Sequence, residues 1–422
     1  MLDLACTGKP IARDFPLSFS LSRLLHVLGD KIPASIAEAT QLKARILSGA
    51  RAECEYRYCT LTIAWTFFYP MAPRLHPVLR QLGIRLPIIQ APMAGTSTPR
   101  MAAAVTNAGG LGSLGIGAMT PATARAAILE AQSLTSGPIN VNVFVHVAPT
   151  SSIDISTRWL DALRPVFREF GAEPPSELKV IYRGFNDDPD VLAMLLEVRP
   201  AVVSFHFGLP SPEAVRRLKE QRAVLVASVT SLEEARAAEA AGMDAVVAQG
   251  YEAGGHRGIF DPFGRDDQLS TVALVRTLVK RTTLPVIAAG GIMDGQGVRA
   301  ALELGAIAAQ MGTAFVVTDE SAADEHHRTA IANGEGTTMT TSISGRPARS
   351  MRNRYTELEE LEGVEVPHYP LTYDVGKALN AAAKGKGEGG FGAQWSGQAA
   401  GLARPMSGAE LMRVLEEELG QA

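Results

Sequence analysis

Apolar and polar residues follow a regular rhythm along the chain from about residue 86 onward. Short apolar runs cover residues 86–91, 111–114, 139–145, 202–207, 223–229, 245–249, 285–289 and 306–311. Longer amphipathic stretches lie between them, most clearly at 99–108, 121–134, 212–221, 231–241 and 295–304. Because short apolar runs are typical of buried strands and amphipathic stretches of helices, the rhythm predicts strands that alternate with helices.

Eight such strands indicate parallel pairing, since each parallel crossover needs a connection long enough to hold a helix. Strands that are apolar almost throughout indicate a sheet buried on both faces. We therefore predict an α/β fold of the (β/α)8 or TIM barrel type. A doubly wound open sheet is the alternative, although it does not require eight strands and usually places a nucleotide loop after its first strand.

Other parts of the chain fall outside this rhythm. Residues 1–70 show no alternation, and we interpret them as an N-terminal extension, weakly structured or a mis-assigned start, with a small dimerisation or lid element as the alternative. The barrel is assigned to residues 75–320. Residues 321–384, with an acidic segment and a Tyr/Pro cluster, are predicted to form a smaller, mostly helical cap domain that binds substrate. A glycine-rich loop and a C-terminal helix occupy residues 385–422.

Composition narrows the possible partners. The 40 Lys and Arg residues against 44 Asp and Glu give a net charge of −4, which disfavours nucleic-acid binding. All three cysteines lie in the first 59 residues, so the rest has no disulfide or thiolate metal site, as in a reducing cytoplasm. The apolar run at 61–69 is too short for a membrane span, and no secretion signal opens the chain. We expect a cytoplasmic monomer or homodimer with no metal ion and no membrane partner.

Glycines gather where the last strands end. Gly290 and Gly291 follow the seventh run, and residues 310–313 close the eighth. In (β/α)8 enzymes a phosphate often binds at the loops after strands 7 and 8, against the N-terminus of a short helix. Basic side chains are sparse here, so we predict a phosphate held by backbone amides. The loop at 249–258 carries four glycines with Gln, Glu, His and Arg, which favours a functional role.

Polar residues also mark the ends of earlier strands. His206 ends the fourth run, where a side chain faces the active site, although a lone histidine in an apolar run is also typical of a core. Asn142 lies inside the third run, and a buried amide needs a partner, such as a flavin edge or neighbouring backbone. Tyr369, Tyr373 and Lys377 are spaced to share a helix face, which is either a substrate pocket or a solvent-facing stripe.

Residues 110–115 spell GxGxxG, the glycine pattern of dinucleotide-binding loops. That pattern has to follow a strand and open a helix. Here the glycines surround the second predicted strand and follow a helical pattern. We therefore interpret them as sites of tight packing in the barrel.

In these motifs the chain resembles the nitronate monooxygenase family, once called 2-nitropropane dioxygenases, over about residues 75–420. The matching stretches are 86–93, 109–112, 141–144, 204–208, 249–258, 290–292, 310–313 and 344–349. The resemblance implies a barrel that binds FMN, with a smaller cap domain. By motif match, the flavin contacts would be Ala91, Pro92, Met93, Asn142, Gln249, Gly254, Gly255, Gly290, Gly291, Gln310, Met311, Gly312 and Thr313. His206 would be the catalytic residue over the reactive face, and Tyr369, Tyr373 and Lys377 would bind substrate.

The implied reaction is oxidation of an alkyl nitronate, or of propionate 3-nitronate, by O2 to a carbonyl compound and nitrite. Lys377 would offset the negative charge of the nitronate, and His206 would be the base if neutral nitroalkanes are also used. Relatives on this barrel include an enoyl-ACP reductase and a quinone reductase. An NAD(P)H-dependent flavin reductase of quinones or enoyl thioesters is therefore one alternative, and a flavin-binding sensor or store is the other.

Overall fold

The computed structural model describes residues 75–421, except 359, 360 and 362. The extension predicted for residues 1–70 lies outside the described residues. The first described element is the short helix α4 (Pro77–Gln81). Among the described helices, none combines the length and hydrophobicity that crossing a bilayer demands.

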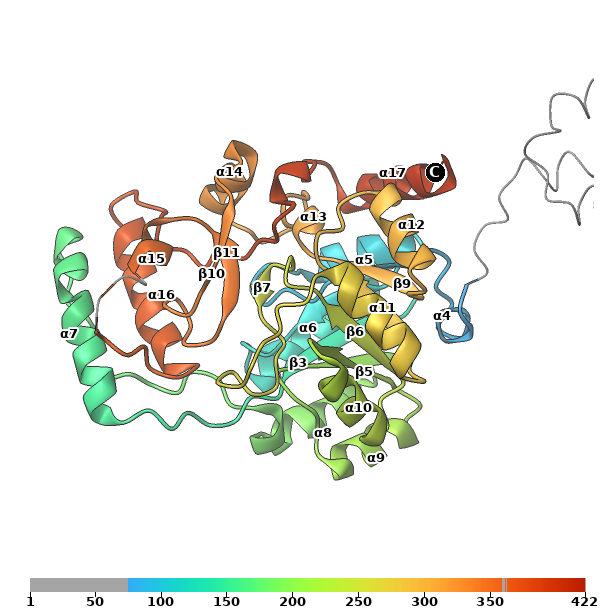
Figure 1. The fold of residues 1–422 in the computed structure, drawn as a ribbon, viewed down its shortest axis with the longest axis horizontal. Helices are drawn as coiled ribbons and strands as arrows, with labels where there is room; N and C mark the ends of the chain where they lie inside the picture. Colours follow the sequence, from blue (N-terminus) through green and yellow to red (C-terminus); the bar gives the residue numbers. More distant parts are fainter. Residues whose placement is uncertain (1–74, 359–360, 362, 422) are drawn as a thin grey trace, which may run out of the picture. The chain divides into compact units, whose positions relative to one another are not determined.

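Eight parallel strands form the centre of the fold (Figure 1). They are β1 (Ile88–Gln90), β2 (Gly112–Gly115), β3 (Ile139–Phe144), β4 (Val202–His206), β5 (Val224–Val229), β6 (Ala245–Gln249), β8 (Val286–Ala289) and β9 (Ala308–Met311). Their order in the sheet is β1-β9-β8-β6-β5-β4-β3-β2. Each strand overlaps one of the apolar runs in the sequence, so the predicted strands and their parallel pairing are confirmed.

The two ends of this sheet meet and close the barrel. Ile89 of β1 forms a parallel bridge with Leu111, just before β2. The amide of Gln90 donates to the carbonyl of Leu111 at 2.9 Å, and the amide of Leu111 donates to the carbonyl of Ile88 at 3.0 Å. An open sheet would leave these strands as free edges. The prediction of a (β/α)8 barrel is therefore confirmed, and the open-sheet alternative is wrong.

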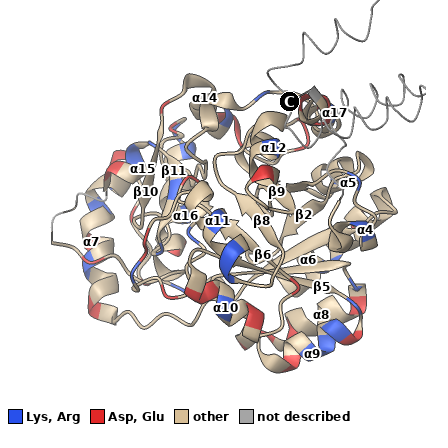
Figure 2. Cartoon of the chain, turned by 45° about the vertical axis from the view of Figure 1, so that its right-hand side comes forward, with Lys and Arg blue, Asp and Glu red and all other residues tan. Residues whose placement is uncertain are grey.

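Helices surround the strands. They are α5 (Pro99–Asn107), α6 (Pro121–Leu134), α8 (Pro189–Val198), α9 (Pro212–Glu220), α10 (Leu232–Ala240), α11 (Thr271–Arg281), α12 (Gly295–Glu303) and α17 (Gly408–Gln421), with short turns at η1 (Phe185–Asp187), α13 (Thr313–Val316) and η3 (Ala400–Leu402). Several of these helices have proline as their first residue, directly after a residue whose side chain caps the helix. In α5 the capping residue is Thr98, whose hydroxyl accepts from the amide of Met101. Charged side chains lie on the outer helices, and the eight strands contain none (Figure 2).

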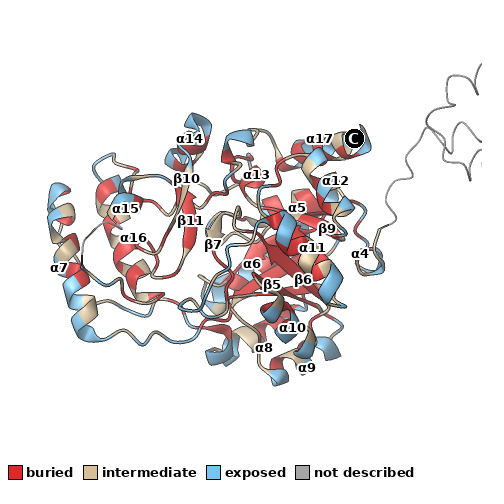
Figure 3. Cartoon of the chain, viewed as in Figure 1, coloured by how far each residue is buried: buried red, intermediate tan, exposed pale blue. Residues whose placement is uncertain are grey.

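In six of the eight strands alternate residues enter two different cores, and most strand residues are buried (Figure 3). On β6, Val246 and Ala248 pack outward against the helices. Ala245 and Val247 pack inward with residues of the other strands, including Ile89. On these strands the two-residue period points apolar side chains into the barrel, below the strand ends. The inward-facing positions at the strand ends are therefore available for a site.

The glycines at 110–115 serve packing, as the sequence indicated. A Cβ on Gly112 would lie 1.9 Å from the carbonyl oxygen of Ala102 in α5. A Cβ on Gly115 would lie 2.8 Å from the amide nitrogen of Ala94. Strand β2 thus touches its neighbours backbone to backbone, and its glycines permit that approach.

A smaller unit packs beside the barrel. It contains α7 (Ile153–Glu169), α14 (Glu325–Asn333), α15 (Arg354–Glu357), α16 (Leu371–Lys384), β10 (Thr337–Thr340) and β11 (Ala348–Met351). Helices α7 and α16 lie side by side, although two hundred residues separate them (Figure 1). Their apolar faces share one core that includes Trp159, Leu379 and Phe391.

This cap is not helical alone. Strands β10 and β11 form an antiparallel sheet with β7 (Gly255–His256), which belongs to the loop after β6. This sheet was not predicted, because its strands are short and polar and show no apolar alternation. The cap core also draws on residues 153–169 and on Phe391, outside the predicted span of 321–384. The proposed domain boundaries stay predictions.

Candidate functional site

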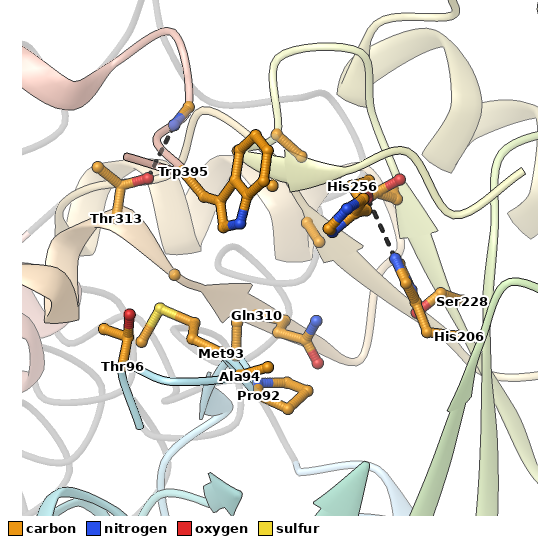
Figure 4. A pocket seen from close by; sticks show the side chains of 18 of the residues that line it. Pro92, Met93, Ala94, Thr96, His206, Ser228, His256, Gln310, Thr313 and Trp395 are labelled. Atoms are coloured by element: carbon orange, nitrogen blue, oxygen red, sulfur yellow. Dashed lines mark hydrogen bonds between the residues drawn. The ribbon is translucent and has the colours of Figure 1, made fainter. Parts of the chain in front are cut away.

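A cavity of about 280 Å³ lies at the C-terminal ends of the barrel strands. Figure 4 shows part of its lining, with His206 and Gln310 at the ends of different strands. All but one of the predicted site residues line it. They are Ala91, Pro92, Met93, Asn142, His206, Gln249, Gly254, Gly255, Gly290, Gly291, Gln310, Met311, Gly312, Thr313, Tyr373 and Lys377. The exception is Tyr369, which is buried behind the wall.

The strand register explains why these side chains meet. Val202 of β4 lies in the inner barrel core, and His206, four residues later on the same face, lines the cavity. On β9, Ala308 and Gln310 show the same change from core to cavity. Because parallel strands end at one edge, polar side chains from distant segments converge there. The site is thus formed by polar side chains that continue the inward-facing apolar rows of the strands.

His206 is held in one orientation by the loop after β6. Its Nε2 atom donates to the carbonyl oxygen of His256 at 3.1 Å. Burial lowers the pKa of His206 from its ordinary value of 6.5 to about 4, the His256 carbonyl raises it, and Arg346 and Arg257 lower it further. His206 is therefore neutral at physiological pH, with the proton on Nε2 and the lone pair on Nδ1.

Gln249 organises the same loop. Its Nε2 donates to the carbonyl of His256 at 2.9 Å, and its Oε1 accepts from the amide of Gly258 at 2.7 Å. The buried guanidinium of Arg257 donates to the carbonyl of Gln249 and forms a two-pronged ion pair with Asp266. Both ends of the Gln249 amide are thus used within the loop. Its position in the cavity wall is fixed, and its polar atoms serve the loop itself.

The floor of the cavity is formed by Pro92 and Met93 after β1 (Figure 4). The amide of Met93 donates to the hydroxyl of Ser97 at 3.0 Å, and the amides of Thr96 and Ser97 donate back to the Met93 carbonyl. The side-chain Nε2 of Gln90 donates to the same Ser97 hydroxyl at 2.9 Å. These bonds hold an apolar surface in place at the mouth of the barrel.

Two amides face the cavity with unused hydrogen-bonding atoms. Asn142 donates its Nδ2 to the carbonyl and hydroxyl of Ser204 at 3.1 and 3.0 Å. Its Oδ1 has no partner among the described residues. The side-chain amide of Gln310 likewise has no hydrogen-bond partner within residues 75–421. Polar atoms of this kind are expected where a ligand supplies the missing partner.

Glycines line the opposite side. Gly290 and Gly291 have φ of +118° and +72°, which side chains rarely tolerate. The hydroxyl of Thr271 donates to the carbonyl of Gly290 at 3.0 Å and fixes this turn. Gly254 packs directly on residues 396 and 397, because a Cβ there would lie 2.5 Å from the amide nitrogen of Gly397. The result is a part of the cavity wall that is formed by glycine backbone.

The cap supplies the remaining wall. Lys377 of α16 places its Nζ 5.0 Å from the ring centre of Tyr182 and 5.6 Å from that of Tyr373. No carboxylate pairs with Lys377 among the described residues. Tyr369 precedes α16, so it does not continue the predicted helical stripe; its ring packs on His146 at 4.9 Å. Of the three residues predicted to bind substrate, Tyr373 and Lys377 therefore line the cavity, and Tyr369 lies one layer behind it.

Several residues of the cavity lining were not predicted as site residues. They include Thr96, Phe144, Tyr182, Ser228 and Trp395, whereas His256 lies in the loop at 249–258 that was predicted to be functional. Ser228 carried a signal, because it lies near the end of a predicted strand. Tyr182 and Trp395 lie in irregular segments far from any strand end, where no spacing marks them. Their placement follows from how the cap folds onto the barrel.

Known proteins match this chain over nearly its whole described length. The nitronate monooxygenase of Paraburkholderia phytofirmans is 56% identical over 349 residues, which are 82% of this chain and 95% of that protein. The nitronate monooxygenase of Pseudomonas aeruginosa is 53% identical over 343 residues, 81% of this chain and 98% of that protein. A crystal structure of nitroalkane oxidase from Streptomyces ansochromogenes has a TM-score of 0.75 and 37% identity, covering 81% of this chain and 98% of that one.

The sequence model of one family, described as nitronate monooxygenase, matches residues 76–418. That range contains the whole barrel, the cap and nearly all of α17. It also contains every residue that lines the cavity. The chain therefore belongs to the nitronate monooxygenase family, whose members are flavin-dependent oxidoreductases.

Proposed function

We propose that this chain binds FMN in the cavity and oxidises alkyl nitronates with O2 to a carbonyl compound and nitrite. The observation that carries the proposal is Lys377, an ammonium with no carboxylate partner among the described residues, in the wall of a cavity suited to a flavin. The named activity of the relatives from P. phytofirmans and P. aeruginosa supports it. When bound, FMN supplies redox chemistry that amino-acid side chains do not.

The described residues fit a flavin ring. Pro92 and Met93 offer a flat apolar floor for it. The free Oδ1 of Asn142 suits a ring N–H, and the amide of Gln310 suits a neighbouring donor or acceptor. These unsatisfied atoms flank the same floor. The ring would therefore find both an apolar surface and polar edge partners.

The glycine wall fits a terminal phosphate. Gly290, Gly291 and Gly312 lack side chains that would keep a phosphate away from the backbone. Thr313 accepts the amide of Gly397 at 2.9 Å, so residues 394–400 close this end of the cavity. A single phosphate is thus favoured over the longer diphosphate of FAD. Heat-released cofactor is expected to run as FMN in chromatography, and recovery of FAD would overturn this assignment.

The cap side fits an anionic substrate. The ammonium of Lys377 complements the negative charge of a nitronate. The buried hydroxyls of Tyr182 and Tyr369 have no hydrogen-bond partner among the described residues. Burial raises the pKa of Tyr182 to about 12, so its phenol stays protonated and can donate. We infer that Lys377 and Tyr182 hold the anion, and that Tyr369 supports them from behind.

His206 is better suited to hold the substrate than to deprotonate it. With a pKa of about 4, its imidazole is a weak base at neutral pH. A nitronate has already lost its proton, so its oxidation does not need a strong base. We therefore propose nitronates, rather than neutral nitroalkanes, as the substrates, with Nδ1 of His206 the atom that remains to interact.

Oxygen uptake and nitrite release test the function. Purified flavin-loaded protein is expected to consume O2 and release nitrite when an alkyl nitronate is added. Anaerobic NADH is expected to leave the flavin oxidised. Rapid bleaching by NADH, together with no reaction with nitronates, would overturn the proposal in favour of a flavin reductase. Bound flavin with neither reaction would favour a sensor or store.

A further inference from the structure

Trp395 projects into the cavity, and its side chain has no role in the function proposed above. It lies in residues 394–400, here called the strap, which follow the glycine-rich loop of the cap. Figure 4 shows its indole across the cavity from Met93 and Gln310. Because it is among the largest side chains in the lining, it limits the free space beside the cap wall.

The backbone of the strap is fixed on both sides of Trp395. Residue 395 forms an antiparallel bridge with Ser350 of β11. The amide of Met351 donates to the carbonyl of Gln394 at 2.9 Å, and the amide of Ser396 donates to the carbonyl of Arg349 at 3.2 Å. The hydroxyl of Ser396 is bonded to Nε2 of His327 at 2.9 Å. The strap is thus tied to the cap sheet and to α14.

The ring of Trp395 is fixed as well. It packs on the imidazole of His256, with ring centres 4.9 Å apart and planes tilted by 54°. The His256 ring also packs on Tyr373, with ring centres 6.2 Å apart. An indole packed on His256 and carried by a strap that is hydrogen-bonded on both sides of it resists displacement by a larger ligand.

We propose that Trp395 determines which nitronates are accepted, by limiting the length of the carbon chain; this inference rests on the proposed function. Lys377 lies over the ring of Tyr373, and the rings of Tyr373 and Trp395 both pack against His256. A nitronate whose oxygens approach Lys377 therefore has the indole beside its carbon chain. Short chains fit the remaining space, and longer chains collide with a wall that cannot relax.

The test compares kcat/KM for linear nitronates of two to six carbons in Trp395→Leu, Trp395→Phe and wild-type enzyme. In Trp395→Leu, the ratio of kcat/KM for the six-carbon to the two-carbon nitronate is expected to rise by about 10-fold or more. Trp395→Phe keeps a ring and is expected to give a smaller rise. Inhibition constants of linear alkanoates from acetate to hexanoate, which need no turnover, are expected to show the same change of preference.

Trp159→Phe is the matched control, because Trp159 is buried in the cap core, away from the cavity. Its length preference is expected to match that of wild type. An equal loss for all chain lengths in both Trp395 variants would overturn the proposal, since Trp395 would then only support the fold. A lower flavin content per protein with an unchanged chain-length preference would also overturn the proposal, because Trp395 would then contact the cofactor and not the substrate. Wild-type enzyme that oxidises no nitronate of any length would instead refute the proposed function itself.

Discussion

The Nε2 atom of His206 lies 3.1 Å from the carbonyl oxygen of His256. Because a carbonyl only accepts, the His206 proton must reside on Nε2. The same oxygen accepts from Nε2 of Gln249 at 2.9 Å. One backbone atom of the loop after β6 therefore sets both the tautomer of His206 and the orientation of Gln249.

The first prediction concerns the protonation state of the substrate. Because His206 has a pKa of about 4, it takes a carbon-bound proton poorly, and effective general-base help is worth about 10²–10⁴ in rate. We expect kcat/KM for a nitronate to exceed that for its neutral nitroalkane by at least about 100-fold. Paired kinetics on the two forms of one compound measure this, and similar values would show that His206 is an effective base.

His206→Asn completes that experiment. The variant is expected to keep its flavin and its melting temperature, and to lose nitronate and residual nitroalkane activity to a similar extent, because His206 holds the substrate in both cases. A much larger loss on the neutral nitroalkane would mean that His206 acts as its base. A lower melting temperature with unchanged activity per bound flavin would make it a core histidine.

The second prediction is a loss of stability in mild acid. Burial is the main cause that lowers the pKa of His146, His206 and His327 to about 4, against 6.5 in the unfolded chain. Between pH 6.5 and 4 the unfolded state therefore binds more protons, and the free energy of unfolding falls as pH falls. Each histidine contributes up to about 1.4 kcal/mol per pH unit. Urea unfolding between pH 7.5 and 5 is expected to show a plateau above pH 7 and a decline below 6.5.

His327→Gln is the control for this effect. His327 bonds Ser396 and does not line the cavity, so glutamine can replace its hydrogen bond without altering the site. The variant is expected to show a shallower decline between pH 6.5 and 5. An unchanged slope would mean that His327 does not contribute to the pH dependence.

The barrel was predictable because its information is local. Each strand is an apolar run, and several helices begin at a capping residue such as Thr98 or Thr120. The floor and the glycine wall were predictable for the same reason, since Met93 and Gly291 directly follow strands. The pattern within each segment was therefore sufficient to predict the fold and the cavity floor.

The part of the cavity wall that the cap supplies could not be predicted in this way. Tyr182 and Trp395 reach the cavity only because α7 and α16 share a core and the strap pairs with β11. Those contacts join segments that are distant in sequence and carry no repeating pattern. The sheet formed by β7, β10 and β11 was missed for the same reason. The position of Tyr369 behind the wall likewise depends on where α16 begins, which spacing alone did not fix.

The third prediction concerns Lys377. Replacing it with methionine removes the positive charge and keeps much of the side-chain volume. We expect Lys377→Met to raise KM for a nitronate by about tenfold or more, since a charge-assisted hydrogen bond is worth about 1.5–3 kcal/mol. Lys384→Met on the same helix is the control, because Lys384 pairs with Asp324 at the surface. An effect of equal size in both variants would contradict a role for Lys377 in binding the anion.

The fourth prediction separates packing from cofactor binding at residues 110–115. A Cβ on Gly112 would lie 1.9 Å from the carbonyl oxygen of Ala102 and 2.5 Å from its carbonyl carbon, so Gly112→Ala must push β2 away from α5. We expect the free energy of unfolding to fall by about 3 kcal/mol or more, the upper range for overpacking. Gly401→Ala, where a Cβ meets open space, is expected to change it little. Urea unfolding and the flavin content of the folded fraction measure both variants. Because Gly112 serves packing, the folded fraction of Gly112→Ala is expected to keep its flavin; normal stability with lost flavin would instead make 110–115 a cofactor loop.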